Sequence, residues 1–244
     1  MRLARISTTD GPREVVQRGE NWHGIADIFA RPPVETGESW PVVGSELLAP
    51  VEPRVILGMA HNGAPGDREL PPQAFMKSAR TAVGPGDAII LRAGTGVVVG
   101  EGELAVVIGA RCRDARAEDV PGLILGYTIG NDVTAVDQVP LDEKMTQSKN
   151  GDGFTPLGPW IETDLDPADV TIAVSVNGEP RVESTTARLA YNVVEQVVYL
   201  SSWLELGPGD IILTGSPQTA TPILPGDVVE IELTGLGVLA NPVH

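Results

Sequence analysis

Glycine and proline interrupt this chain so often that it can fold only from short elements. The 244 residues include 28 glycines and 21 prolines, about a fifth of the chain, without a collagen-like period. Runs rich in valine and isoleucine stand between them, which is typical of strands separated by turns. The hydrophobic fraction of 42% is enough to bury one sizeable core. We therefore predict a β-rich α+β fold.

Strands are expected at apolar runs along most of the chain, namely 3–8, 54–58, 87–92, 96–109, 123–133, 170–176, 210–214 and 228–233. Asn177-Gly178 predicts a type I′ hairpin turn, because both central positions need positive φ. Only 188–205 has helical periodicity, and Gly207 is expected to end it. Its apolar face is formed by Leu189, Val193, Val197, Leu200 and Leu204.

The composition changes near residue 50. Before it stand a short strand and a Pro-rich linker over 31–53, and after it the apolar runs become frequent. We therefore expect a small N-terminal domain over 1–50 and a catalytic domain over 51–244.

The charge balance excludes several classes of partner. Lys and Arg total 17 and Asp and Glu total 33, so the net charge is −16. Such a chain repels phosphate backbones and anionic lipid, so we expect neither nucleic acid nor a membrane as partner. A single cysteine, Cys112, excludes an internal disulfide, and no apolar run approaches the roughly 18–20 residues that span a bilayer. The N-terminus lacks the apolar region of a secretory signal, so we expect a cytoplasmic protein.

Common catalytic motifs are missing from the sequence. It has no G-x-S-x-G nucleophile elbow and no phosphate-binding P-loop. The glycine run at 94–100 has the wrong spacing for a dinucleotide fingerprint, and the run at 235–240 leaves no room for the helix that must follow it. Both are expected to be turns.

Carboxylates occur within apolar runs. Glu101 and Glu103 are two residues apart in an expected strand, so their side chains should lie on the same face. Buried together, they would need protonation or a cation between them, whereas on an open face they would simply be hydrated. Asp132 ends another apolar run and could equally form a turn. Three carboxylates without thiolates favour a hard cation, Mg²⁺ first and then Mn²⁺ or Ca²⁺.

Six collinear motifs over about 54–243 resemble the fumarylacetoacetate hydrolase family. They are E-G-E-L-A-V-V-I-G from 101, G-Y-T-I-G-N-D-V-T-A-V-D-Q from 126, F-T-P-L-G-P-W from 154, V-N-G-E from 176, G-D-I-I-L-T-G-S-P from 209, and P-G-D-V-V-E-I-E from 225. The resemblance implies a roll of mixed β-sheets around a carboxylate-bound Mg²⁺, and a homodimer.

The same resemblance implies roles for individual residues. Glu101, Glu103 and Asp132 look like the metal ligands, and Lys149 like the lysine beside the metal. A further set is expected at the substrate: Lys77, Gln138, Thr214 and Gly215.

Two positions depart from the family pattern. The family's Gly-x-Asn-Tyr-x-x-His-x-x-Glu stretch supplies a water-activating dyad, but Ala64 stands at its histidine position here. His61 could replace that base, oriented by Asp67 or Glu69, or it could be an ordinary loop histidine. An arginine often used on substrate is replaced by Val136.

The resemblance predicts metal-dependent chemistry on a small 2-oxo or diketo acid. Hydrolysis of a C–C bond in an acylpyruvate is our first prediction, with His61 activating water. Decarboxylation or keto–enol isomerisation of an oxaloacetate-like acid is the alternative, and a catalytically inactive, metal-stabilised binding protein is a third possibility.

Overall fold

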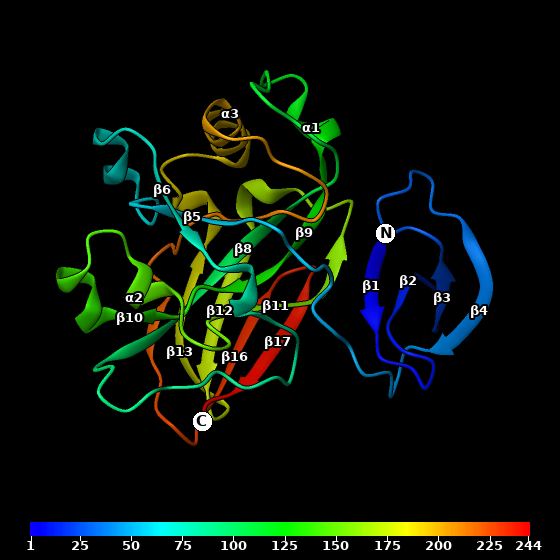
Figure 1. Cartoon of the computed structure of the whole chain (residues 1–244), viewed down its shortest axis with the longest axis horizontal. Helices are drawn as coiled ribbons and strands as arrows, with labels where there is room; N and C mark the ends of the chain where they lie inside the picture. The colour runs from blue at the N-terminus through cyan, green and yellow to red at the C-terminus, as the bar shows by residue number, and fades with distance from the viewer.

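A computed structural model describes all residues, 1–244, and shows two sheets (Figure 1). The large sheet has 13 strands in the order β4-β3-β2-β1-β11-β9-β8-β14-β5-β6, with β10 and β15 paired to β8 and β7 paired to β11. Its strands are β1 (Arg2–Ile6), β2 (Arg13–Arg18), β3 (Asn21–Ile25), β4 (Glu35–Pro41), β5 (Ile56–Ala60), β6 (Gln73–Lys77), β7 (Ala82–Val83), β8 (Val98–Ile108), β9 (Ile124–Asn131), β10 (Thr134–Ala135), β11 (Thr155–Glu162), β14 (Ile211–Leu213) and β15 (Ala220–Pro222).

The smaller sheet has four antiparallel strands in the order β13-β12-β16-β17. They are β12 (Thr171–Val176), β13 (Glu179–Thr185), β16 (Val228–Leu233) and β17 (Gly237–Pro242). Asn177 and Gly178 join β12 to β13 with φ of 56° and 75°, which confirms the predicted turn.

Helices are few and short. The α-helices are α1 (Val120–Leu123), α2 (Thr146–Lys149) and α3 (Val193–Trp203), and the 3-10 helices are η1 (Pro65–Glu69), η2 (Ala79–Thr81), η3 (Val136–Leu141), η4 (Pro167–Asp169) and η5 (Thr186–Arg188). None of them combines the length and apolar character needed to cross a membrane. The β-rich mixed fold predicted from the sequence is therefore confirmed.

Strand β8 separates the two main hydrophobic cores. Leu104 and Val106 belong to the core that also includes the inner face of the small sheet and the buried side of α3. Ala105 and Val107 belong to a second core, on the other face of β8. Residues of odd number on β8, Glu101 and Glu103 among them, therefore point away from the small sheet.

The first fifty residues extend the large sheet. Strand β1 pairs antiparallel with β11, so β2, β3 and β4 continue the sheet outward, at the right of Figure 1. Leu3, Val16 and Ile25 enter the same core as Ala105. This small unit is thus packed against the larger one.

Three local predictions were wrong. The helix begins at Val193 rather than 188, because Asn192 forms a capping box with Glu195 and a separate 3-10 turn precedes it. Segment 87–92 is no strand: Ile89 forms only an isolated bridge, to Val243. The expected linker over 31–53 contains strand β4.

Candidate active site

A cavity of about 350 Å³ lies beside β8, where β5 and β9 end. Five of the residues predicted for the site line it together: His61, Glu101, Glu103, Asp132 and Lys149. They come from segments far apart in the sequence, which the order of the large sheet brings together.

Strand pairing places the three carboxylates. Glu101 and Glu103 project from the same face of β8, as their spacing predicts. Strand β9 pairs antiparallel with β8, and the Asp132 amide just after it donates to the Glu101 carbonyl at 3.0 Å. Asp132 therefore lies beside the two glutamates. All three carboxylates line one cavity.

Lys149 joins two of these carboxylates. Its Nζ lies 3.1 Å from Glu101 Oε2 and 2.5 Å from Asp132 Oδ2, and it donates to the Thr134 hydroxyl at 2.7 Å. The ammonium also lies 4.6 Å from the centre of the Phe75 ring, within cation–π range. Burial works against the charge on Lys149, but Asp132 and Glu101 raise its pKa above the usual value. Lys149 is therefore a fixed cation in the wall of the cavity.

Lys77 lies outside the cavity lining and supports Asp132. Its side chain is fully buried, and Nζ donates to Asp132 Oδ1 at 2.5 Å and to the Phe154 carbonyl at 2.6 Å. Burial lowers the pKa of Lys77. Burial alone would raise the pKa of Asp132, but Lys77 and Lys149 hold it below the usual value. The geometry thus favours a structural contact over the predicted direct contact of Lys77 with substrate.

Glu103 is the carboxylate without a lysine partner. Its Oε2 accepts the Gly215 amide at 2.7 Å, and the residue is 2% exposed. Burial, together with the charges of Asp132 and Glu101, raises its pKa well above the usual value. An ionised Glu103 therefore lacks charge compensation in this arrangement.

Carboxylate oxygens are the ligands that a hard divalent cation prefers. The side chains are not arranged around a metal position in this structure, because no three acidic, histidine or cysteine side chains converge closely enough to hold an ion. Lys149 lies between Glu101 and Asp132, and Glu103 holds a backbone amide. Oε1 of both glutamates has no hydrogen-bond partner, whereas both Asp132 oxygens are bound to lysines. When all five groups are ionised, the three carboxylates and two ammonium groups leave one negative charge, which a hard cation would compensate.

His61 stands at the exposed side of the cavity. It follows β5 directly and has a φ of 52°, in the left-handed region that is uncommon for a residue with a side chain. No hydrogen bond joins it to Asp67 or Glu69. Asp67 Oδ2 instead accepts the amides of Gly63 and Ala64 at 2.9 and 3.0 Å, as a cap of η1. The expected partnership of Asp67 with His61 is therefore absent from this geometry.

Asn62, which the sequence analysis missed, fixes the loop that carries His61. Its Nδ2 donates to the carbonyls of Thr214 and Tyr191 at 2.7 and 3.1 Å, and its Oδ1 accepts the Tyr191 amide. The next residue, Gly63, packs so closely that an added Cβ would lie 2.2 Å from the Ser216 carbonyl oxygen. His61 is therefore carried by a loop that hydrogen bonds and close packing hold in place.

The remaining residues predicted to bind substrate make hydrogen bonds within the protein. Thr214 is fully buried, and its hydroxyl donates to the Leu104 carbonyl at 2.8 Å. Gly215 reaches the site only through its amide on Glu103. Gln138 donates to the Thr95 carbonyl at 3.0 Å and lines a neighbouring cavity. Thr134, by contrast, belongs to the site, because its hydroxyl donates to Glu101 Oε2 at 2.6 Å. Its position two residues after Asp132 could have identified it.

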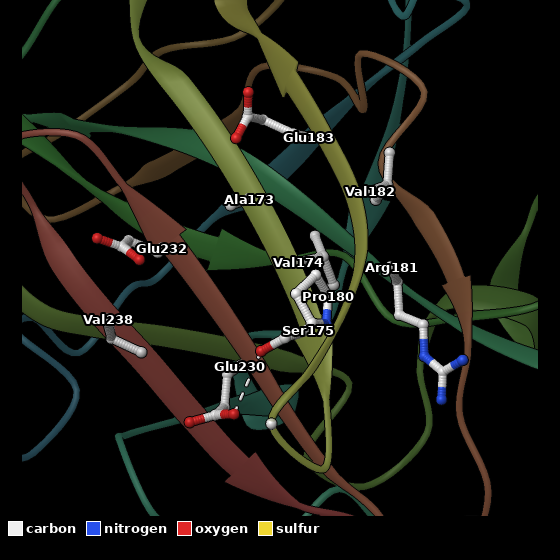
Figure 2. A pocket seen from close by; sticks show the side chains of 11 residues that line it. Ala173, Val174, Ser175, Pro180, Arg181, Val182, Glu183, Glu230, Glu232 and Val238 are labelled. Atoms are coloured by element: carbon white, nitrogen blue, oxygen red, sulfur yellow. Dashed lines mark hydrogen bonds between the residues drawn. The ribbon is translucent and has the colours of Figure 1, made fainter.

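A second cavity, of about 410 Å³, lies on the small sheet (Figure 2). Its acidic side chains, Glu183, Glu230 and Glu232, spread apart from one another in Figure 2. Only one side-chain hydrogen bond joins the residues drawn, from Ser175 to Glu230 at 3.2 Å. None of the predicted site residues lines this cavity. The cavity beside β8 is therefore the candidate active site.

Comparison with known proteins identifies the family. The model described as fumarylacetoacetate (FAA) hydrolase C-terminal matches residues 52–244, and the one described as Rv2993c-like, N-terminal matches residues 1–50. The chain belongs to the fumarylacetoacetate hydrolase family. Protein Rv2993c of Mycobacterium tuberculosis is 38% identical over 100% of this chain and 98% of its own length.

Similar solved structures of the fumarylacetoacetate hydrolase family include enzymes named as isomerases. A 5-carboxymethyl-2-hydroxymuconate delta-isomerase from Mycobacterium smegmatis is 42% identical, with a TM-score of 0.93 over 100% of this chain and 99% of its own. A 2-hydroxyhepta-2,4-diene-1,7-dioate isomerase from Mycobacterium marinum is 40% identical, with a TM-score of 0.93 over 100% and 98%. A maleylpyruvate hydrolase from Sphingobium, in complex with manganese(II) and pyruvate, is 28% identical, with a TM-score of 0.82 over 100% and 98%.

Proposed function

We propose that this protein is a metal-dependent isomerase that interconverts the enol and keto forms of a small unsaturated 2-oxo acid. The observation that carries the proposal is the composition of the cavity. Three carboxylates and Lys149 line it, while His61 has no carboxylate to orient it as a water-activating base. The isomerase names of the mycobacterial neighbours support the same class.

The reaction moves one proton and one double bond. A proton leaves the enol oxygen, the C=C electrons shift along the conjugated chain, and a proton joins a carbon further along. No C–C bond breaks and no water is consumed. The protein must therefore stabilise negative charge on the 2-oxygen and exchange a proton at one carbon.

The named residues supply these two functions. Glu101, Glu103 and Asp132 would hold Mg²⁺ or Mn²⁺. When bound, the cation supplies Lewis-acid stabilisation of negative charge on the 2-oxygen. Lys149, fixed by Glu101, Asp132 and Thr134, adds positive charge at the same end of the cavity. His61, exposed at the other side and without a hydrogen-bond partner, is the group we assign to proton exchange.

C–C bond hydrolysis, our first prediction from sequence, needs an oriented base that activates water. Asp67 is engaged with two backbone amides and position 64 is alanine, so this geometry offers no His–carboxylate pair in the loop. We therefore place isomerisation before hydrolysis and before decarboxylation.

Product identification tests the proposal. With Mg²⁺ in D₂O, a 2-hydroxy-2,4-dienoic acid should give a 2-oxo product with the same carbon skeleton and deuterium at one carbon. Proton NMR measures this conversion. His61→Ala should slow this conversion roughly 10²-fold, because proton exchange loses its carrier. Glu69→Gln, an exposed change outside the cavity, is the matched control and should leave the rate unchanged. Release of pyruvate from an acylpyruvate, or of CO₂ from oxaloacetate, at a higher rate than isomerisation would contradict the proposal.

A further inference from the structure

We infer that this site selects a substrate whose far end, away from the carboxylate cluster, is apolar and uncharged rather than a second carboxylate. The inference rests on the proposed function and narrows its substrate class.

Apolar side chains line the cavity together with the carboxylates, and they come from four parts of the fold. Met59 lies near the end of β5, Phe75 lies on β6 with its ring beside Lys149, and Val99 lies near the start of β8. Val136, Val139 and Met145 lie on η3 and the turn before α2. A hydrocarbon group in this space would bury its surface against apolar side chains, which is favourable by about 25 cal/mol per Å².

Positive charge is confined to the end of the cavity with the carboxylates. Lys149 already contacts two carboxylates and a hydroxyl. Lys77 lies behind Asp132, outside the lining, and no arginine lines the cavity. His61 is exposed and is assigned to proton exchange. A second carboxylate would therefore contact apolar side chains and find no fixed cationic partner among the lining residues, which is unfavourable.

The inferred preference differs from the molecule in the name of one neighbour. The name 2-hydroxyhepta-2,4-diene-1,7-dioate describes a molecule with a carboxylate at each end. The 2-oxo end would meet the cation held by the three carboxylates, whereas the lining offers the other end apolar side chains and no fixed cation.

A matched pair of substrates tests the inference. One is a 2-hydroxy-2,4-dienoic acid that ends in a methyl group, and the other is the diacid in which a carboxylate replaces that methyl. With Mg²⁺, the methyl-ended acid should have a kcat/KM at least about tenfold higher, because only the diacid leaves a charge unpaired. A higher kcat/KM for the diacid would overturn the inference.

Two variants of one wall residue provide the control. Val136 is 40% exposed, so a longer side chain can be accommodated there without filling a core. Val136→Arg should reverse the preference by giving the diacid a partner, while Val136→Leu should keep it. Equal preferences in Val136→Arg and wild type would contradict the inference.

Failure of the proposed function is distinguishable from failure of this inference. If neither acid is isomerised, the reaction is wrong, and the same pair is compared by its dissociation constants in the presence of Mn²⁺. Tighter binding of the methyl-ended acid would still support the selectivity, and tighter binding of the diacid would overturn it.

Discussion

Replacing Lys77 with methionine is expected to lower the free energy of unfolding by about 3–5 kcal/mol, the range for removing one partner of a buried ion pair. The Lys77 side chain is fully buried, and its Nζ contacts Asp132 Oδ1 at 2.5 Å. Its loss also leaves the Phe154 carbonyl without this donor. Urea denaturation at neutral pH measures the change.

A double variant separates the ion pair from simple loss of packing. Asp132→Asn removes the charge that Lys77 compensates. The double variant Lys77→Met/Asp132→Asn should therefore lose less free energy of unfolding than the sum of the losses in the two single variants. We expect a coupling free energy of about 1 kcal/mol or more between the two positions, as for residues in direct contact. Stability of Lys77→Met within about 0.5 kcal/mol of wild type, the usual range for surface changes, would rule out a supporting role for Lys77.

Replacing Glu103 with glutamine should lower Mg²⁺-dependent turnover strongly while leaving the fold intact. Glutamine keeps the shape and can still accept the Gly215 amide, but it removes one anionic ligand. Changes beside metal ligands typically cost 10–100-fold in affinity or activity, so loss of a ligand should cost at least about 100-fold. Steady-state rates across Mg²⁺ concentrations measure the effect, and rates equal to wild type would contradict it.

The same variant should be more heat-stable than wild type when both are free of metal at pH 8. The pKa of Glu103 is raised in the folded protein, so the folded state binds more protons than the unfolded one. Stability is therefore lost as the pH rises towards that folded pKa, and glutamine removes this loss. Glu183→Gln, on the other sheet and exposed, is the matched control and should change neither stability nor activity. A lower melting temperature for Glu103→Gln would show that the charge at this position is compensated.

The parts of the site that depend on local geometry could be predicted from the sequence. Glu101 and Glu103 share a face because side chains alternate along a strand, and β8 has this alternation. The Asn177-Gly178 turn was predictable for a similar reason, since few residue pairs tolerate its backbone angles.

Contacts between distant segments could not be predicted in this way. Lys77 and Asp132 are 55 residues apart, and the strand order β9-β8-β14-β5-β6 in the large sheet brings their neighbourhoods together. The engagement of Asp67 with backbone amides depends on the path of the η1 loop, which no periodicity encodes. The start of α3 was predicted too early, because the apolar spacing of the helix extends to residues before its N-cap, Asn192.

Calorimetric titration of Mn²⁺ into the metal-free protein tests the central claim, that Glu101, Glu103 and Asp132 hold a divalent cation in this cavity. The predicted result is one site per chain in wild type and in Glu183→Gln, with binding at least about 100-fold weaker in Glu103→Gln and Asp132→Asn. Unchanged Mn²⁺ affinity in those two variants would contradict the assignment of the site and the isomerase chemistry built on it.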